Sequence, residues 1–197
     1  MIFQFAKAKV YNRGVPPDSF LTELVEWGRT ASNDIFALNP YNDIYSKTKA
    51  ELGPWESDKH RRAVMLEVMR VLAGFESSWD WTEGVDTSRL GNDTPENSEA
   101  GAWQVSYNAR NLATELRVLL SNNSIKNGIE FQQAMKFNHP LAMEFVARLM
   151  RHNTKHNGPL YKGKERDAIR KSLRGNEHSI YPHLSRNAVS EFQTLLS

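Results

Sequence analysis

The chain has 197 residues, of which 40% are hydrophobic and 24% are charged, with a net charge of +2 and no cysteine. This composition is typical of one globular domain that is long enough to bury a core. It excludes disulfides and thiolate chemistry, and no apolar run approaches the roughly 20 residues that a membrane-spanning helix needs. The start, "MIFQFAKAKVYNRG", has no basic region ahead of a long apolar stretch, so we expect no secretory signal.

The first helical pattern covers residues 18–31, "DSFLTELVEWGRTA", with Asp18 or Ser19 as the expected cap. The apolar positions that should face the core are Leu21, Leu24, Val25 and Trp27. "NPYND" at 39–43 is typical of a turn.

The strongest helical pattern is "ESDKHRRAVMLEVMRVLAGFE", residues 56–76, with Ser57 or Asp58 as its cap. Gly74 is expected to mark its end. A wide apolar face predicts burial on much of the circumference, and its members are Val64, Met65, Val68, Met69, Val71, Leu72 and Phe75.

Residues 82–101 are dense in Gly, Asn, Asp, Thr, Pro and Ser, which predicts a long loop. Loops of this length in a compact domain are usually functional or disordered. One short strand is expected near "AWQVS", and the fold class is mostly α. Further helices are predicted at 107–120, 129–137, 140–152, 164–173 and 185–196.

Charge is distributed unevenly along the chain. The acidic loop holds Glu76, Asp80, Glu83, Asp86, Asp93, Glu96 and Glu99 against the single Arg89. Residues 148–174 are rich in Lys and Arg, with only Glu165 and Asp167 as acids. The basic segment either meets a polyanion, such as nucleic acid or an anionic cell envelope, or forms a solvated helix face.

Glu76 occupies an unusual position in "GFESSWDW", residues 74–81. A helix C-terminus carries the negative end of the macrodipole, so a cation would be favoured there. The dipole and the neighbouring apolar side chains should both disfavour the charged carboxylate and raise its pKa, as a general acid near neutral pH requires. Lysozyme is the known example of a glutamate tuned in this way. The alternative is a glutamate that turns outward to solvent.

Two further sequence blocks follow Glu76-Ser77: Gly101-Ala102-Trp103-Gln104-Val105, and "KHNGP" at 155–159. In this order the three blocks resemble the lysozyme-like superfamily, specifically lytic transglycosylases and goose-type lysozymes. In those families a helix ends in Glu-Ser, a Gly-Leu-Met-Gln-Val-like segment follows a loop, and a Tyr-Asn-Gly element comes last. Here Ala102-Trp103 replaces Leu-Met and His156 replaces the tyrosine, and the loop is longer, as in a divergent member.

The resemblance implies a single lysozyme-like domain of the transglycosylase type over residues 1–197. Residues 1–55 would be a helical extension packed on the catalytic core of 56–160, and 161–197 would form C-terminal helices. Glu76 would protonate the glycosidic oxygen between N-acetylmuramic acid and N-acetylglucosamine in peptidoglycan. In a transglycosylase the same residue then acts as base, and the 6-hydroxyl of muramic acid attacks C1.

A hydrolase would need a second carboxylate, about 5 to 5.5 Å from the first in a retaining enzyme and further away in an inverting one. Asp93 and Glu99 are the favoured candidates, and the alternative is that these acids only keep the loop soluble. Residues expected at the substrate are Ser77, which would orient Glu76, and Trp79, Trp103, Gln104, His156 and Asn157. Each has a plain alternative as a cap, a core side chain or a turn residue.

No cofactor or metal is expected, because the chain has no phosphate-binding glycine motif, no HExxH and no GxSxG. The expected function is therefore a muramidase or lytic transglycosylase that degrades the cell wall. It would be made in the cytoplasm and reach peptidoglycan after lysis, as a phage endolysin does, or by injection, as an antibacterial toxin does. An injected toxin would have an immunity protein as partner. The alternative is a non-catalytic protein that binds glycan, or nucleic acid through 148–174, although the acidic loop argues against nucleic acid.

Overall fold

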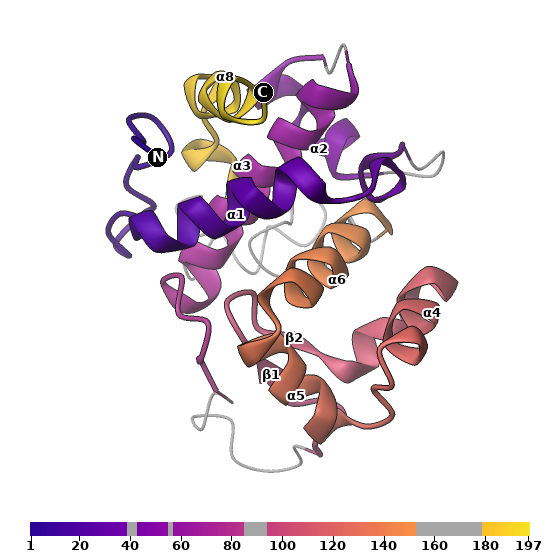
Figure 1. Cartoon of the computed structure of the whole chain (residues 1–197). Helices are drawn as coiled ribbons and strands as arrows, with labels where there is room; N and C mark the ends of the chain where they lie inside the picture. Colours follow the sequence, from indigo (N-terminus) through magenta and orange to yellow (C-terminus); the bar gives the residue numbers. More distant parts are fainter. Residues whose placement is uncertain (39–42, 55–56, 85–93, 153–178) are drawn as a thin grey trace, which may run out of the picture.

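The structure is a computed structural model and describes residues 1–38, 43–54, 57–84, 94–152 and 179–197. Figure 1 shows the arrangement of its elements, which are mostly α as predicted. In chain order they are α1 (Asp18–Thr30), the 3-10 helix η1 (Asn33–Phe36), α2 (Ile44–Leu52), α3 (Asp58–Ser77), β1 (Glu99–Ala100), β2 (Val105–Ser106), the 3-10 helix η2 (Tyr107–Leu112), α4 (Thr114–Asn122), α5 (Gly128–Phe137), α6 (His139–His152), the 3-10 helix η4 (Tyr181–His183) and α8 (Arg186–Leu195).

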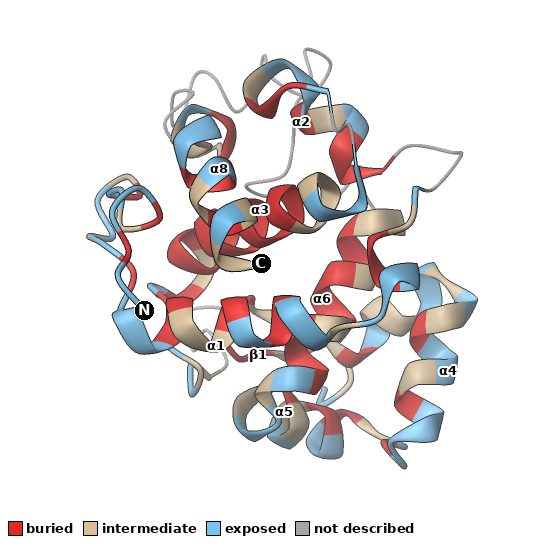
Figure 2. Ribbon diagram, turned by 45° about the horizontal axis from the view of Figure 1, so that its top comes forward, coloured by how far each residue is buried: buried red, intermediate tan, exposed pale blue. Residues whose placement is uncertain are grey.

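Helix α3 is the centre of the fold. Every residue from Ala63 to Phe75 is buried, which confirms the wide apolar face that the sequence predicts (Figure 2). Ser57 caps the helix, because its hydroxyl oxygen accepts a 3.1 Å hydrogen bond from the backbone N–H of His60. Helices α1, α2, α6 and α8 and the short helix η1 pack around it, so α3 is sheathed by neighbours from both ends of the chain.

Strands β1 and β2, the 3-10 helix η2 and helices α4 and α5 form a second part beside this helical cluster, whereas η4 packs on α2. Strands β1 and β2 pair antiparallel as a two-stranded hairpin, with Glu99 opposite Ser106 and Ala100 opposite Val105. The hairpin packs on α5, and α4 packs on η2 (Figure 1). Helix α6 contacts both parts, since it packs on α1, α2 and α3 as well as on α4 and α5. None of the helices in the described ranges is long and apolar enough to cross a bilayer.

The N-terminal segment is bound to this core by hydrogen bonds to Glu191 and from Arg70. The side chain of Glu191 in α8 accepts hydrogen bonds from the backbone N–H groups of Gln4, Phe5 and Ala6, at 2.6, 3.0 and 2.6 Å. In α3, Arg70 and Glu67 form an ion pair whose side chains are both 0% exposed. Arg70 also donates to the carbonyl of Ala8, at 3.1 Å. The segment before α1 is therefore part of the folded core.

Three local predictions need correction. No side chain caps α1, whose N-cap is Pro17, and Asp18 instead pairs with Lys7. Helix α3 does not stop at Gly74 but continues to Ser77. The predicted helix at 107–120 is two helices, η2 and α4, because Ala113 between them is extended. Helix α2 was not indicated by the sequence pattern. The predicted turn at 39–43 lies, except for Asp43, outside the described residues.

Other helix predictions are confirmed within a residue or two, namely those of α1, α5, α6 and α8. The strand expected near residues 102–106 is reduced to Val105–Ser106 in β2. The predicted helix at 164–173 lies outside the described residues. The division of the chain at residues 55 and 160 stays a prediction.

Candidate active site at the end of helix α3

Glu76 lies in the last turn of α3 and is half-buried. It follows the buried Phe75 and precedes the buried Ser77. The helix ends directly after it, because Ser78 and Trp79 adopt left-handed backbone conformations with φ of 58° and 64°. Their N–H groups donate to the carbonyls of Gly74 and Ala73, which satisfies the last turn. The carboxyl group thus stands at a sharply terminated, mostly buried helix end.

Gly74 has a packing role in this turn. A Cβ at this position would lie 2.7 Å from the indole ring of Trp79, so only glycine lets the ring fold back over the helix. The indole N–H of Trp79 then donates a 2.8 Å hydrogen bond to the carbonyl of Arg70, and the side chain is 4% exposed. Trp79 therefore takes the core role that the sequence left open, and it offers little surface to a sugar.

The hairpin docks on the end of α3 through two hydrogen bonds. The hydroxyl of Ser77 donates to the carbonyl of Ala102 at 2.8 Å, and the indole N–H of Trp103 donates to the carbonyl of Met69 at 2.9 Å. Trp103 is 3% exposed and is a core residue like Trp79. The two sequence blocks that resemble one family, Glu76-Ser77 and Gly101–Val105, are therefore adjacent in space.

Gln104 occupies the turn of this hairpin with a left-handed φ of 44°. Its side-chain amide donates to the carbonyl of Gly101 at 3.0 Å and to that of Glu83 at 3.4 Å. The side chain therefore holds the loop backbone, which is the alternative to a sugar-binding role. Glu99 is half-buried in β1, at the start of the same hairpin.

Non-glycine residues with left-handed backbone gather around this helix end. Ser78, Trp79 and Gln104 surround the junction of α3 and the hairpin, and Tyr11, with φ of 42°, stacks its ring on Phe75 at 6.1 Å between centroids. Each such residue is costly by about 1–3 kcal/mol, and in proteins they cluster at functional sites. Four of the five such residues in the described ranges lie at this junction, and the fifth, Ser124, follows α4, so the junction is the candidate site.

Three of the predicted site residues, Asp93, His156 and Asn157, lie outside the described residues. In the part of the chain that the structure describes, no group of three or more His, Asp or Glu is placed to hold a metal ion.

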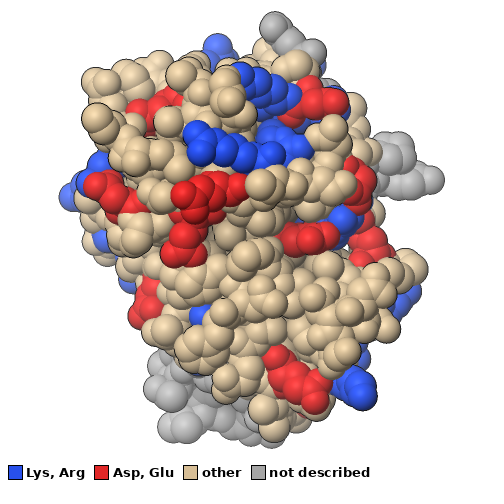
Figure 3. Space-filling view, viewed as in Figure 1, with Lys and Arg blue, Asp and Glu red and all other residues tan. Residues whose placement is uncertain are grey.

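The described part of the basic segment is engaged in ion pairs. Arg148 pairs with Asp34, Glu115 and Glu144, and Glu115 also pairs with Arg151. These contacts join η1, α4 and α6. Figure 3 shows that acidic and basic side chains also lie next to one another on the surface around α1 and α8.

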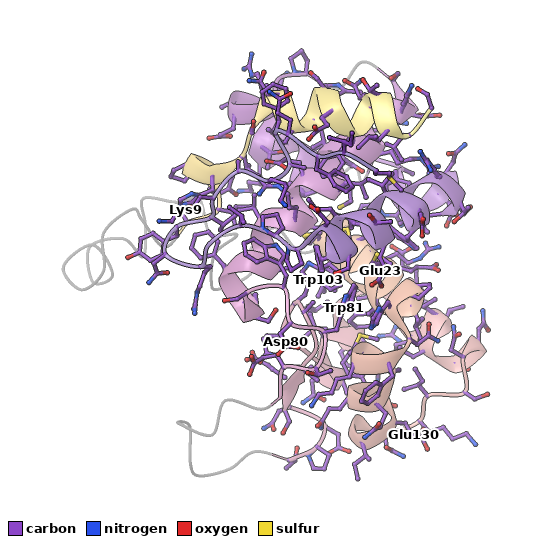
Figure 4. All side chains as sticks on the ribbon, turned by 60° about the vertical axis from the view of Figure 1, so that its left-hand side comes forward. Lys9, Glu23, Asp80, Trp81, Trp103 and Glu130 are labelled. Atoms are coloured by element: carbon purple, nitrogen blue, oxygen red, sulfur yellow. The ribbon has the colours of Figure 1, made fainter. Side chains whose placement is uncertain are left out.

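Sequence reasoning missed one cluster beside the junction. The ring of Trp81 stacks on that of His139, with centroids 3.8 Å apart and planes 6° apart, and His139 Nδ1 pairs with the carboxylate of Glu23. Figure 4 shows Glu23, Trp81 and Trp103 close together between α1 and α6. Glu23, His139 and Trp81 come from α1, α6 and the segment after α3. No local spacing in the sequence could therefore have indicated this cluster.

Comparison of the chain with family models, with curated proteins and with solved structures gave no match.

Proposed function

We propose that this protein is a peptidoglycan-cleaving glycosidase of the lysozyme-like type, with Glu76 as the general acid and base. The bond cleaved is the β-1,4 linkage between N-acetylmuramic acid and N-acetylglucosamine. The observation that carries the proposal is the hydrogen bond from Ser77 to the carbonyl of Ala102. Through this bond the Glu-Ser helix end and the hairpin with Gln104, recognised separately in the sequence, form one junction.

The surroundings of Glu76 support the role of an acid. Glu76 is a half-buried residue in the last turn of α3, where the negative end of the helix dipole lies. A general acid protonates the leaving oxygen from its neutral form, and a negative helix end disfavours a negative charge placed beside it. Ser77 supports the geometry by fixing the helix end against the hairpin.

The choice between hydrolysis and transglycosylation depends on a second carboxylate. Glu99 in β1 starts the hairpin that docks on α3. Of the two predicted second carboxylates, it is the one that lies within the described residues. In a transglycosylase no second carboxylate is needed, since the substrate's own 6-hydroxyl replaces water. The products therefore distinguish the two reactions, because only transglycosylation leaves 1,6-anhydro ends.

The test is digestion of purified peptidoglycan with the wild type and with Glu76→Gln, followed by mass spectrometry of the soluble fragments. Glu26→Gln is the matched control, because Glu26 is an exposed glutamate on α1 and is not one of the proposed site residues. We expect fragments from the wild type and the control and none from Glu76→Gln. Anhydro ends identify a transglycosylase, and reducing ends identify a hydrolase and call for Glu99→Gln.

Binding to the wall without any product would instead indicate a non-catalytic glycan-binding protein. A nucleic-acid-binding role draws less support, because Arg148 and Arg151, the described arginines of the basic segment, already pair with carboxylates. Such a role predicts affinity that falls steeply with salt and is indifferent to Glu76→Gln.

A further inference from the structure

The cluster of Glu23, His139 and Trp81 joins three elements that meet beside the candidate site. Glu23 lies on α1, His139 is the first residue of α6, and Trp81 lies in the segment that leaves α3. The side chains of Glu23 and His139 are 36% and 28% exposed, so the pair lies at the edge of the core. We call these three residues the α1–α6 clasp.

The ring of Trp81 contacts the rings of neighbouring residues in the described part of the chain. One face stacks on His139, while Phe20 and Trp103 contact the ring at centroid distances of 5.3 and 5.2 Å. Its indole Nε1 is buried and has no hydrogen-bond partner among the described residues. A buried donor left unpaired is unfavourable by about 1–3 kcal/mol, so the ring contacts must outweigh that cost to keep Trp81 in place.

The segment that Trp81 anchors is hydrogen-bonded to the hairpin. Two residues after Trp81, the carbonyl of Glu83 accepts from the backbone N–H of Gly101 at 3.0 Å and from the side-chain amide of Gln104 at 3.4 Å. Trp81 also packs edge-to-face on Trp103 of the same hairpin. Displacing Trp81 would therefore remove support from the hairpin on two sides.

From these contacts we propose that Glu23 and His139 are positioning residues, which hold Trp81 and through it the Gly101–Gln104 turn against the end of α3. For the reaction this inference rests on the proposed function, since the turn is positioned relative to Glu76. Neither residue is a catalytic residue in this account. Their effect on the site is transmitted by the stacked ring of Trp81 and the carbonyl of Glu83.

The chain offers a matched control at the other end of α6. His152 pairs with Glu115, and its side chain is 28% exposed, as that of His139 is. Both are histidine–glutamate pairs that tie α6 to a neighbouring helix. His152→Ala therefore removes a histidine–glutamate pair from α6 while it leaves the stack of His139 on Trp81 in place.

The test compares wild type, His139→Ala, His139→Phe, Glu23→Ala and His152→Ala by amide hydrogen exchange and by peptidoglycan cleavage, at a temperature where all five are folded. We expect the Gly101 amide to exchange about tenfold faster in His139→Ala, and faster in Glu23→Ala, but not in His152→Ala. His139→Phe keeps a ring for stacking and should recover part of the protection. In parallel, kcat should fall by about tenfold or more in His139→Ala with a smaller change in KM.

An unchanged exchange rate of the Gly101 amide in His139→Ala would overturn the inference. An equal increase of that rate in His152→Ala would overturn it too. Faster exchange with an unchanged kcat would overturn the positioning role in the reaction. If the wild type cleaves no peptidoglycan, the proposed function fails, and the exchange data still decide whether the clasp holds the turn.

Discussion

The hydroxyl of Ser77 donates a 2.8 Å hydrogen bond to the carbonyl of Ala102, 25 residues further along the chain. Ser77 is the last residue of α3 and Ala102 lies in the turn between β1 and β2. The bond is buried, and it joins the residue after Glu76 to the residue two before Gln104. Together with the bond from the Trp103 indole to the Met69 carbonyl, this contact fixes the hairpin against the helix end.

Ser77→Ala should weaken both stability and cleavage. The change leaves the buried carbonyl of Ala102 without its donor, so we expect a loss of about 1–3 kcal/mol in the free energy of unfolding, measured with urea. We expect kcat to fall by about tenfold or more, because the hairpin is no longer fixed beside Glu76. Ser77→Thr keeps the hydroxyl and should retain most activity, and equal loss in both variants would argue against the hydrogen bond.

Removing one partner of the buried Arg70–Glu67 pair should be strongly destabilising. Arg70→Met leaves the carboxylate of Glu67 fully buried with only the Ser185 N–H as a described donor, and such changes lower stability by about 3–5 kcal/mol. The double variant Glu67→Leu/Arg70→Met should lose less than Arg70→Met alone, because no unpaired charge remains. Urea unfolding of the three proteins checks this, and an additive double variant would contradict it.

The sequence predicts the centre of the fold better than its edges. Helix α3 is recognisable because its apolar residues recur at helical spacing around most of the circumference, a local signal that tertiary contacts reinforce. The predicted end at Gly74 is wrong, because this glycine is not a stop signal. It serves the close approach of the Trp79 ring, which only the folded chain reveals.

The candidate site divides in the same way. The pairing of Glu76-Ser77 with the Gly101–Val105 block could be expected from a resemblance in sequence order. The inward packing of Trp79 and Trp103 could not be predicted, because tryptophan is common both in protein cores and at sugar-binding sites. The stack of Trp81 on His139 joins residues 58 positions apart, which leaves no periodic pattern to read.

The ion pairs of Glu115 should make stability fall in acid. Burial alone would raise the pKa of this carboxyl, but hydrogen bonds and charge attraction from Arg151 and Arg148 outweigh it and hold the pKa below its ordinary 4.5. A pKa lowered in the folded state contributes stability that is complete above 4.5 and is lost as the pH falls through the folded-state value.

Urea unfolding of wild type and Glu115→Gln at pH 7 and at pH 3 measures this contribution. The wild type should have the larger free energy of unfolding at pH 7. The difference in this free energy between the two proteins should be smaller at pH 3. A gap that widens in acid would show that the sign is wrong.

Gly101 and Gly14 form a matched pair for testing how closely the hairpin must approach α5. Both have left-handed backbone, with φ of 76° and 92°, so alanine is strained at either position. A Cβ at Gly101 would lie 2.6 Å from the carbonyl oxygen of Met135 in α5, whereas a Cβ at Gly14 would have nothing within 4 Å. Gly14→Ala should therefore lose only the conformational term, about 1–2 kcal/mol.

Gly101→Ala should lose more stability than Gly14→Ala, because the backbone of α5 must also move. Gly101→Ala should also lower kcat, because the hairpin that carries Gln104 is displaced from α5. Gly14→Ala should leave kcat near the wild-type value. Urea unfolding and peptidoglycan cleavage of both variants separate the strain of the turn from the contact with α5. Equal losses in the two variants would mean that the hairpin tolerates displacement, and that its close docking is not what the site requires.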